Sequence, residues 1–296
     1  MSNETFFYNV AGHIFSVETC GCPLTKMDNY APFATGPIET PVFSLTTTDS
    51  ENAPEYTEET RQEDEGQTII CGKTQNGEST FEFLLGKVST GLLICSQNFK
   101  QNKIYVRKSN FHSEQTFHYA INNALMVLYS LATAKADTAL FHAAVIRNND
   151  RGYLFLGKSG TGKSTHARLW LKYNEGSSLL NDDNPVIRLH KNADGKTFAK
   201  VYGSPWSGKT PCYKNEEVDV GGFVLLSQAP YNKIARLKGV AAYAALVPCI
   251  SGMRWDKEIA DGLHRTENGL ASSVPVWHLE CLPDEAAAKL CKESIA

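Results

Sequence analysis

A glycine-rich segment at residues 157–164 constrains the fold of this chain more than any other feature. It reads Gly157-Lys158-Ser159-Gly160-Thr161-Gly162-Lys163-Ser164 and fits the pattern Gly-x-x-x-x-Gly-Lys-Ser. An apolar run at 153–156 precedes it, and a run with helical spacing at 165–173 follows it. Glycines let backbone N–H groups turn inward around an anion, and a helix that starts there directs its positive end to the same point. The segment therefore predicts a strand, a phosphate-binding loop (P-loop) and a helix.

The residue types of this loop are those that bind a nucleoside triphosphate. Lys163 supplies a point charge to the β- and γ-phosphates, and the Ser164 hydroxyl is a ligand for Mg²⁺. We therefore expect residues 157–165, up to Thr165, to bind nucleotide. The predicted cofactors are ATP, with GTP left open, and Mg²⁺.

A second segment fits the same pattern. It reads Gly203-Ser204-Pro205-Trp206-Ser207-Gly208-Lys209-Thr210. Pro205 removes one backbone N–H from the loop, and Pro211 follows immediately without a helical period. We interpret it as a loop that touches substrate or nucleotide. The candidate residues for substrate contact are Trp206, Ser207, Lys209 and the separate Arg254.

Length and composition limit the other classes. The chain has 296 residues, is 42% hydrophobic and 21% charged, and carries a formal net charge of −3. These values favour one large or two ordinary globular domains and argue against a nucleic-acid partner, which would require a basic surface. The apolar runs are too short to span a bilayer, and the first residues lack a basic signal region, so we expect a cytoplasmic protein without a membrane partner.

Cysteine spacing adds one alternative. Among eight cysteines only Cys20 and Cys22 are close together. A zinc site there is the alternative to free thiols in a reducing compartment, which the missing export signal favours.

The first third of the sequence predicts a mostly antiparallel sheet over about residues 5–108. Asn76-Gly77 lies between two strand-like runs and indicates a hairpin. Residues 49–66 carry eight acidic residues and one arginine, which predicts a solvated loop, with an acidic metal site as the alternative. A helical period over 116–134 then marks a junction between an N-terminal domain, 1–130, and a P-loop domain, 131–296.

Beyond the loop the sequence alternates between strand and helix signals. Strands are expected at 197–202, 222–227 and 274–281, and helices at 236–248, at 252–272 and from 282–284 onward, with Pro283 near the first turn. The predicted class is α/β (α+β), with a mixed sheet in the second domain.

Two acidic residues and a histidine complete the candidate site. Asp182 and Asp183 follow an apolar step about twenty residues beyond the loop. Phosphoryl transfer uses one carboxylate to hold Mg²⁺ and one to accept the acceptor's proton. An exposed Asp-Asp-Asn-Pro turn is the alternative. His142 lies on an apolar run expected to be a strand, where it either packs in the core or reaches the phosphates.

These residues, in this order and spacing, resemble a known family. Phe141-His142-Ala143, the glycine loop and Asp182-Asp183 resemble the C-terminal kinase domain of HPr kinase/phosphorylase and related proteins. Segments 203–209 and 274–284 are similar to further parts of these kinases. The pairing of Ser-Gly-Thr-Gly-Lys with Asp-Asp also resembles ATP-dependent phosphoenolpyruvate carboxykinase, whose nucleotide core shares this fold.

The resemblance implies a role for each matching residue. It implies a compact mixed sheet that carries the P-loop, Asp182 as the base and Asp183 with Ser164 as Mg²⁺ ligands. It also implies Lys163 as the phosphate clamp and His142 near the phosphates. The HPr kinase signature segment and basic C-terminal loop are not recognisable here, so neither phosphorolysis nor HPr as acceptor is implied.

The sequence therefore favours an ATP-dependent kinase that phosphorylates a hydroxyl, such as a serine of a protein or peptide. The alternatives are a carboxykinase-like small-molecule phosphotransferase and a non-catalytic nucleotide sensor. Lys209, Arg236 and Arg254 are candidates for stabilising phosphate charge. The expected partners are nucleotide and an unidentified acceptor, with a homo-oligomer left open.

Overall fold

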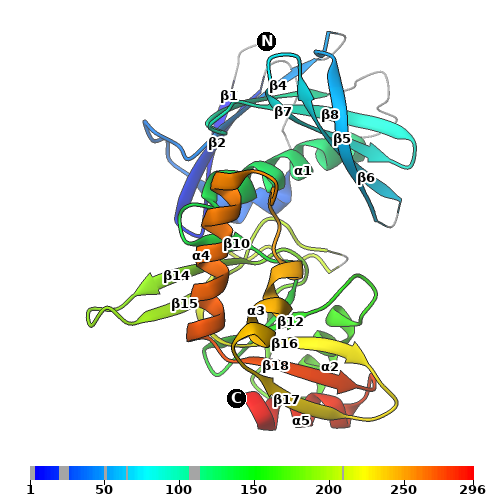
Figure 1. The fold of residues 1–296 in the computed structure, drawn as a ribbon, viewed down its shortest axis with the longest axis vertical. Coiled ribbons are helices and arrows are strands. Elements are labelled where there is room, and N and C mark those ends of the chain that lie inside the picture. The colour runs from blue at the N-terminus through cyan, green and yellow to red at the C-terminus, as the bar shows by residue number, and fades with distance from the viewer. Residues whose placement is uncertain (1–3, 20–26, 50–51, 65, 107–113, 209) are drawn as a thin grey trace. The chain divides into compact units, whose positions relative to one another are not determined.

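The computed structural model describes residues 4–19, 27–49, 52–64, 66–106, 114–208 and 210–296. The chain divides into two compact units, Met1–Ala132 and Thr133–Ala296 (Figure 1). The sequence predicts this division between residues 130 and 131. Among the described residues, each unit contains one large sheet of nine strands, so the chain has the mixed α/β class predicted from the sequence.

The N-terminal unit consists of strands followed by one long helix. Its elements are β1 (Glu4–Val10), β2 (His13–Thr19), η1 (Asp28–Phe33), β3 (Ala34–Thr35), β4 (Ser44–Asp49), β5 (Tyr56–Asp64), β6 (Gln67–Thr74), β7 (Ser79–Leu85), β8 (Val88–Cys95), β9 (Gln101–Val106) and α1 (Glu114–Thr133). The strand order is β3-β1-β2-β4-β9-β8-β7-β6-β5. Among the described strands of this unit, only β2–β4 and β4–β9 are parallel pairs, so the sheet is mostly antiparallel, as predicted.

Local sequence explains the main features of this unit. Gly77 has a φ of +79° in the turn between β6 and β7, which glycine adopts without strain. The apolar face of α1 packs on the sheet, and Gly91 permits this because a Cβ there would lie 3.1 Å from the Cβ of Ala120. The rings of Phe15 and Phe43 stack at 4.8 Å in the buried core.

The acidic segment was predicted wrongly. Most of it is β5, which pairs antiparallel with β6 from Tyr56↔Thr74 to Asp64↔Gln67. β5 is the last strand of the sheet, so its backbone is paired on one side, and the side chains of Glu58, Glu59 and Glu63 are exposed. Charged residues on an edge strand also discourage pairing with other chains. The described residues contain no group of three or more His, Cys, Asp or Glu that could hold a metal ion, and Cys20 and Cys22 lie outside them.

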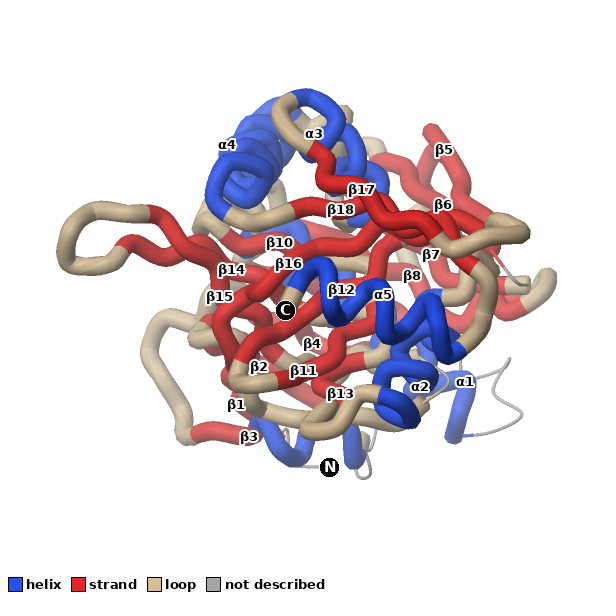
Figure 2. Tube along the Cα trace, turned by 90° about the horizontal axis from the view of Figure 1, so that it is seen from below, coloured by secondary structure: helices blue, strands red, loops and turns tan. Residues whose placement is uncertain are grey.

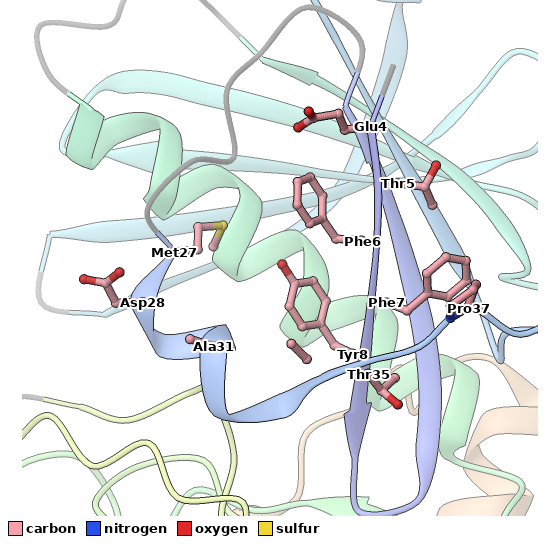
Figure 3. A pocket seen from close by; sticks show the side chains of 11 residues that line it. Glu4, Thr5, Phe6, Phe7, Tyr8, Met27, Asp28, Ala31, Thr35 and Pro37 are labelled. Atoms are coloured by element: carbon pink, nitrogen blue, oxygen red, sulfur yellow. The ribbon is translucent and has the colours of Figure 1, made fainter. Parts of the chain in front are cut away.

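An open groove of about 560 Å³ lies at the outer edge of β1 (Figure 3). β3 pairs with β1 only at Phe7 and Tyr8. Phe6 and Tyr8 extend from one face of β1, on the side where Met27 at the start of η1 lies, and Phe7 extends from the other face. All of its lining residues belong to the N-terminal unit, so the groove is distinct from the candidate site below.

The C-terminal unit alternates strands and helices. Its elements are β10 (Thr138–Leu140), β11 (Ala144–Asn148), β12 (Arg151–Leu156), α2 (Lys163–Tyr173), β13 (Ser178–Asn181), β14 (Val186–Lys191), β15 (Thr197–Tyr202), β16 (Glu217–Gln228), β17 (Lys233–Leu237), α3 (Val240–Leu246), η3 (Val247–Cys249), α4 (Lys257–Ser273), β18 (Val276–Cys281) and α5 (Glu285–Ile295). The main strand order is β10-β14-β15-β16-β12-β11-β13. The parallel β12–β16 and β16–β18 pairs make the sheet mixed.

Helices pack against this sheet on two sides. α2 and α5 lie side by side, and α3 and α4 lie on the opposite side (Figure 2). Trp170 of α2 and Cys291 of α5 are fully buried against Phe155 and Val224 of the central strands. Within the described residues, no helix is long and apolar enough to cross a bilayer.

Two helical segments begin later than predicted. Residues 233–237 form β17, which pairs with β18, so α3 starts only after Gly239 at a φ of +56°. α4 begins at Lys257 because the Asp256 side chain accepts a hydrogen bond from the Ile259 N–H at 3.0 Å. In both places tertiary pairing or a cap sets the boundary, not the apolar period.

Candidate active site

The sheet brings the predicted site residues to one edge. β11 is antiparallel to both β12 and β13, so β12 and β13 run in the same direction on either side of it. Residues that follow β12 and β13 therefore share an edge with residues that precede β11. The glycine loop follows β12, Asp182-Asp183 follow β13, and His142 precedes β11. His142 lies in the connection from β10 to β11 and not within a strand as predicted. The N–H groups of His142 and Ala143 bond to the carbonyls of Cys249 and Asp183, and not to a neighbouring strand.

The glycine loop has the conformation that its composition predicts. Gly157, Gly160 and Gly162 have φ values of +147°, +76° and +107°, which favour glycine. Gly162 precedes α2 in the left-handed region without a side-chain cap. The first N–H groups of α2 therefore have no capping side chain, which is the usual arrangement of an anion site at a helix N-terminus.

Lys163 folds back over the loop. Its Nζ donates hydrogen bonds to the carbonyls of Gly157, at 3.0 Å, and Lys158, at 3.3 Å. The residue is buried, whereas Lys158, Ser159 and Gly160 are exposed and Thr161, Ser164 and Thr165 are half-buried. The ammonium group thus lies against the loop, where it could exchange carbonyl partners for phosphate oxygens.

The two aspartates differ in accessibility. Asp182 is 7% exposed, whereas the Asp183 side chain is 33% exposed. Asp183 Oδ1 lies 3.9 Å from His142 Nε2, and the Ala143 N–H donates to the Asp183 carbonyl at 2.8 Å. The structure therefore brings His142 and Asp183 together, and Asp183 is the carboxylate more open to a ligand.

Cys249 connects the two halves of the site, and sequence reasoning missed it. Its carbonyl accepts the His142 N–H at 2.7 Å. Burial raises the pKa of its thiol. A hydrogen bond from the Gly157 backbone and the positive charge of Lys163 lower this pKa, but by less. A β-bridge between Phe141 and Ile250 brings Cys249 next to His142. The two segments are far apart in the sequence, so no local pattern predicts this contact.

The second Gly-x-x-x-x-Gly-Lys-Thr match packs over the aspartates. A Cβ at Gly208 would lie 3.2 Å from Asp183 Cβ and 3.3 Å from the Asp182 carbonyl. A Cβ at Gly203 would collide with the Lys214 carbonyl, at 2.0 Å. The glycines therefore allow close backbone packing, and no helix follows them, as predicted.

The substrate-loop candidates have unequal access to a ligand. Trp206 is 2% exposed, so its side chain packs in the interior and offers a ligand little surface. Ser207 is half-buried and donates its hydroxyl to the Thr210 carbonyl at 2.7 Å. Lys209 lies outside the described residues.

The two arginine candidates have protein partners. Arg254 donates to Glu267 Oε1 at 2.7 Å and to the Val247 carbonyl at 2.8 Å. The exposed Arg236 stacks on Trp277 at 4.9 Å. Both contacts explain these side chains without a ligand.

Comparisons with known proteins add one similarity. No protein-family model matches the chain, and no curated protein matches it. Among solved structures, the HPr(Ser) kinase/phosphatase from Coxiella burnetii is similar over 52% of this chain and 91% of its own, with 12% identity and a TM-score of 0.28. So loose a similarity says nothing about chemistry, which must follow from the residues of the site.

Proposed function

We propose that the chain is an ATP-dependent kinase that transfers the γ-phosphoryl group to a hydroxyl, such as a serine of a protein or peptide. The observation that carries the proposal is the shared sheet edge, where the glycine loop, His142 and Asp182-Asp183 follow or precede three adjacent strands. Phosphoryl transfer requires mainly positioning and electrostatic stabilisation, and these residue types supply both.

The residues divide the chemical work as follows. Backbone N–H groups of the loop and α2 bind the phosphates, and Lys163 moves from the loop carbonyls to the phosphate oxygens. Asp182 accepts the proton of the acceptor hydroxyl, as the family resemblance implies. His142, beside Asp183, lies near the transferred group.

The oxygen donors at this edge fit Mg²⁺. This ion is usually held by one or two carboxylates together with phosphates and waters, so a protein cluster of three ligands is not required. Asp183 and Ser164 are accessible oxygen donors and would hold the ion. When bound, Mg²⁺ would supply positive charge that offsets the negative charge developing during phosphoryl transfer.

The test compares three single variants of the full chain. A fluorescent ATP analogue measures binding, and transfer of labelled phosphate from ATP to a peptide panel measures turnover. Lys163→Met should weaken binding by about 100-fold, since the lysine is the main phosphate cation. Asp182→Asn should keep binding and lose about 10²–10⁴-fold in turnover, the usual contribution of a general base.

Lys172→Met is the matched control, because Lys172 lies exposed on the same helix and contacts Tyr173. A wild-type chain that binds the ATP analogue but never transfers phosphate would identify a nucleotide sensor instead. Turnover only with oxaloacetate would identify a carboxykinase-like enzyme. Absence of nucleotide binding by the wild type would refute the proposal.

A further inference from the structure

Asn181 is a buried polar residue immediately before the aspartate pair. It is the last residue of β13, and its side chain is fully buried. Its Oδ1 accepts the Asp183 N–H at 2.9 Å. Its Nδ2 donates to Ser204 Oγ at 3.1 Å and to the Trp206 carbonyl at 3.3 Å. The partners fix the orientation of the amide, because the Asp183 N–H can only donate and the Trp206 carbonyl can only accept.

Ser204 extends this network into the segment 203–208. Its hydroxyl accepts from Asn181 Nδ2 and from the Trp206 N–H, and donates to the Asn184 carbonyl. The Asn184 N–H in turn donates to the Trp206 carbonyl at 3.1 Å. Ser204 is fully buried, so its single proton and two lone pairs are all used within the protein. Fully satisfied buried networks of this kind hold one arrangement of the backbone.

The network acts on Asp183 from several directions. Its N–H is held by Asn181 and its carbonyl by the Ala143 N–H. Gly208 packs closely on the Asp183 side chain, since a Cβ added at Gly208 would lie 3.2 Å from Asp183 Cβ. With both backbone groups bonded and the side chain in contact, the Asp183 carboxylate is directed toward His142.

We propose that Asn181 is a positioning residue that links the buried segment 203–206 to Asp183 and fixes the direction of its carboxylate. The effect on Mg²⁺ use rests on the proposed kinase function, whereas the effect on the position of Asp183 stands without it. The second glycine match then acts as a support for the carboxylates and not as a second phosphate loop.

The experiment compares Asn181→Ala with Asn148→Ala in the full chain. Asn148 is also fully buried, and its Nδ2 donates to the Glu175 carbonyl and to Ser177 Oγ, both at 3.0 Å. It lies at the end of β11 away from His142. Asn148→Ala therefore removes a buried amide without touching the candidate site, and is the matched control. The Mg²⁺ concentration for half-maximal binding of the ATP analogue is measured, together with a crystal structure of each variant.

Asn181→Ala should raise this Mg²⁺ concentration by about 10-fold or more, as expected when a residue that orients a metal ligand is removed. Asn148→Ala should leave it within about 2-fold. Asn181→Ser, whose hydroxyl can keep the local bond to the Asp183 N–H, should fall between them and also serves if the alanine variant does not fold.

The crystal structures give a reading that does not depend on nucleotide. The Asp183 carboxylate should move by about 1 Å in Asn181→Ala, which is enough to impair a site. A carboxylate within about 0.5 Å of its original position would overturn the proposal. An equal rise in the Mg²⁺ requirement in both alanine variants would also overturn it. If the wild type binds no nucleotide, the kinase function fails, while the displacement of Asp183 still decides the positioning role.

Discussion

His166 should make the stability of the C-terminal unit sensitive to acid. This residue of α2 is 3% exposed, packs edge-on against Phe155, and accepts the Trp170 Nε1–H at its Nε2, at 3.2 Å. Its Nδ1 has no hydrogen-bond partner among the residues that the structure describes. Protonation would charge a buried ring and break the bond from Trp170. Burial accordingly lowers the pKa of His166 from 6.5 to about 4.

The sign follows from proton linkage. Between pH 6.5 and about 4 the unfolded chain binds a proton at this site and the folded chain does not, so stability rises with pH in this range. The contribution of the neutral His166 to the free energy of unfolding is fully present above pH 6.5 and is lost as the pH falls toward 4. With these pKa values the loss is about 2 kcal/mol at pH 5 and about 3 kcal/mol at pH 4.

Urea unfolding followed by tryptophan fluorescence measures this effect. All four tryptophans lie beyond residue 132, so the signal reports the C-terminal unit alone. His166→Gln removes the titrating group and keeps an acceptor for Trp170. The stability difference between wild type and variant should shift by about 2 kcal/mol between pH 7.5 and pH 5, with the wild type losing more. A difference that stays constant over this range would refute the argument.

Two further predictions concern the site. Gly208→Ala should lower turnover in the proposed kinase reaction by about 10-fold, because the added Cβ would press on Asp183. Gly36→Ala, whose Cβ would have no atom within 4 Å, should have no effect, and equal activities of the two variants would contradict the packing argument. Arg254→Ala should destabilise the C-terminal unit by about 3 kcal/mol in the same urea assay, because it leaves the fully buried Glu267 without its cation. The double variant Arg254→Ala, Glu267→Gln should recover much of this stability, because it removes the buried charge as well.

Local sequence patterns predicted the elements that depend on local chemistry. The glycine loop and its flanking strand and helix lie where the spacing indicates, and so does the hairpin at Gly77. Asp284 caps α5 by accepting the Ala287 N–H at 2.8 Å, close to the predicted start of the last helix. Each of these features depends on residues within a few positions of one another, so a short window of sequence contains the cause.

The features that were missed depend on contacts between distant segments. β5 is a strand because β6 offers it a register of hydrogen bonds, although its own composition is that of a solvated loop. Cys249 lies beside the loop because Ile250 pairs with Phe141 and the Cys249 carbonyl accepts the His142 N–H. Composition carries no information about such pairing, because the backbone groups that form it are the same in every residue.

The two glycine matches show how one pattern can serve two structural purposes. In the first, glycines at positive φ shape a loop that opens toward the N-terminus of α2. In the second, neither Gly203 nor Gly208 has a positive φ. A Cβ at Gly203 would collide with the Lys214 carbonyl, and one at Gly208 would lie only 3.2 Å from Asp183 Cβ. The pattern alone indicates only that these positions exclude a side chain. Whether the reason is an anion site or close packing depends on whether a helix follows. Without a helix terminus to attract an anion, the second segment has only its close packing on Asp182 and Asp183 to account for its glycines.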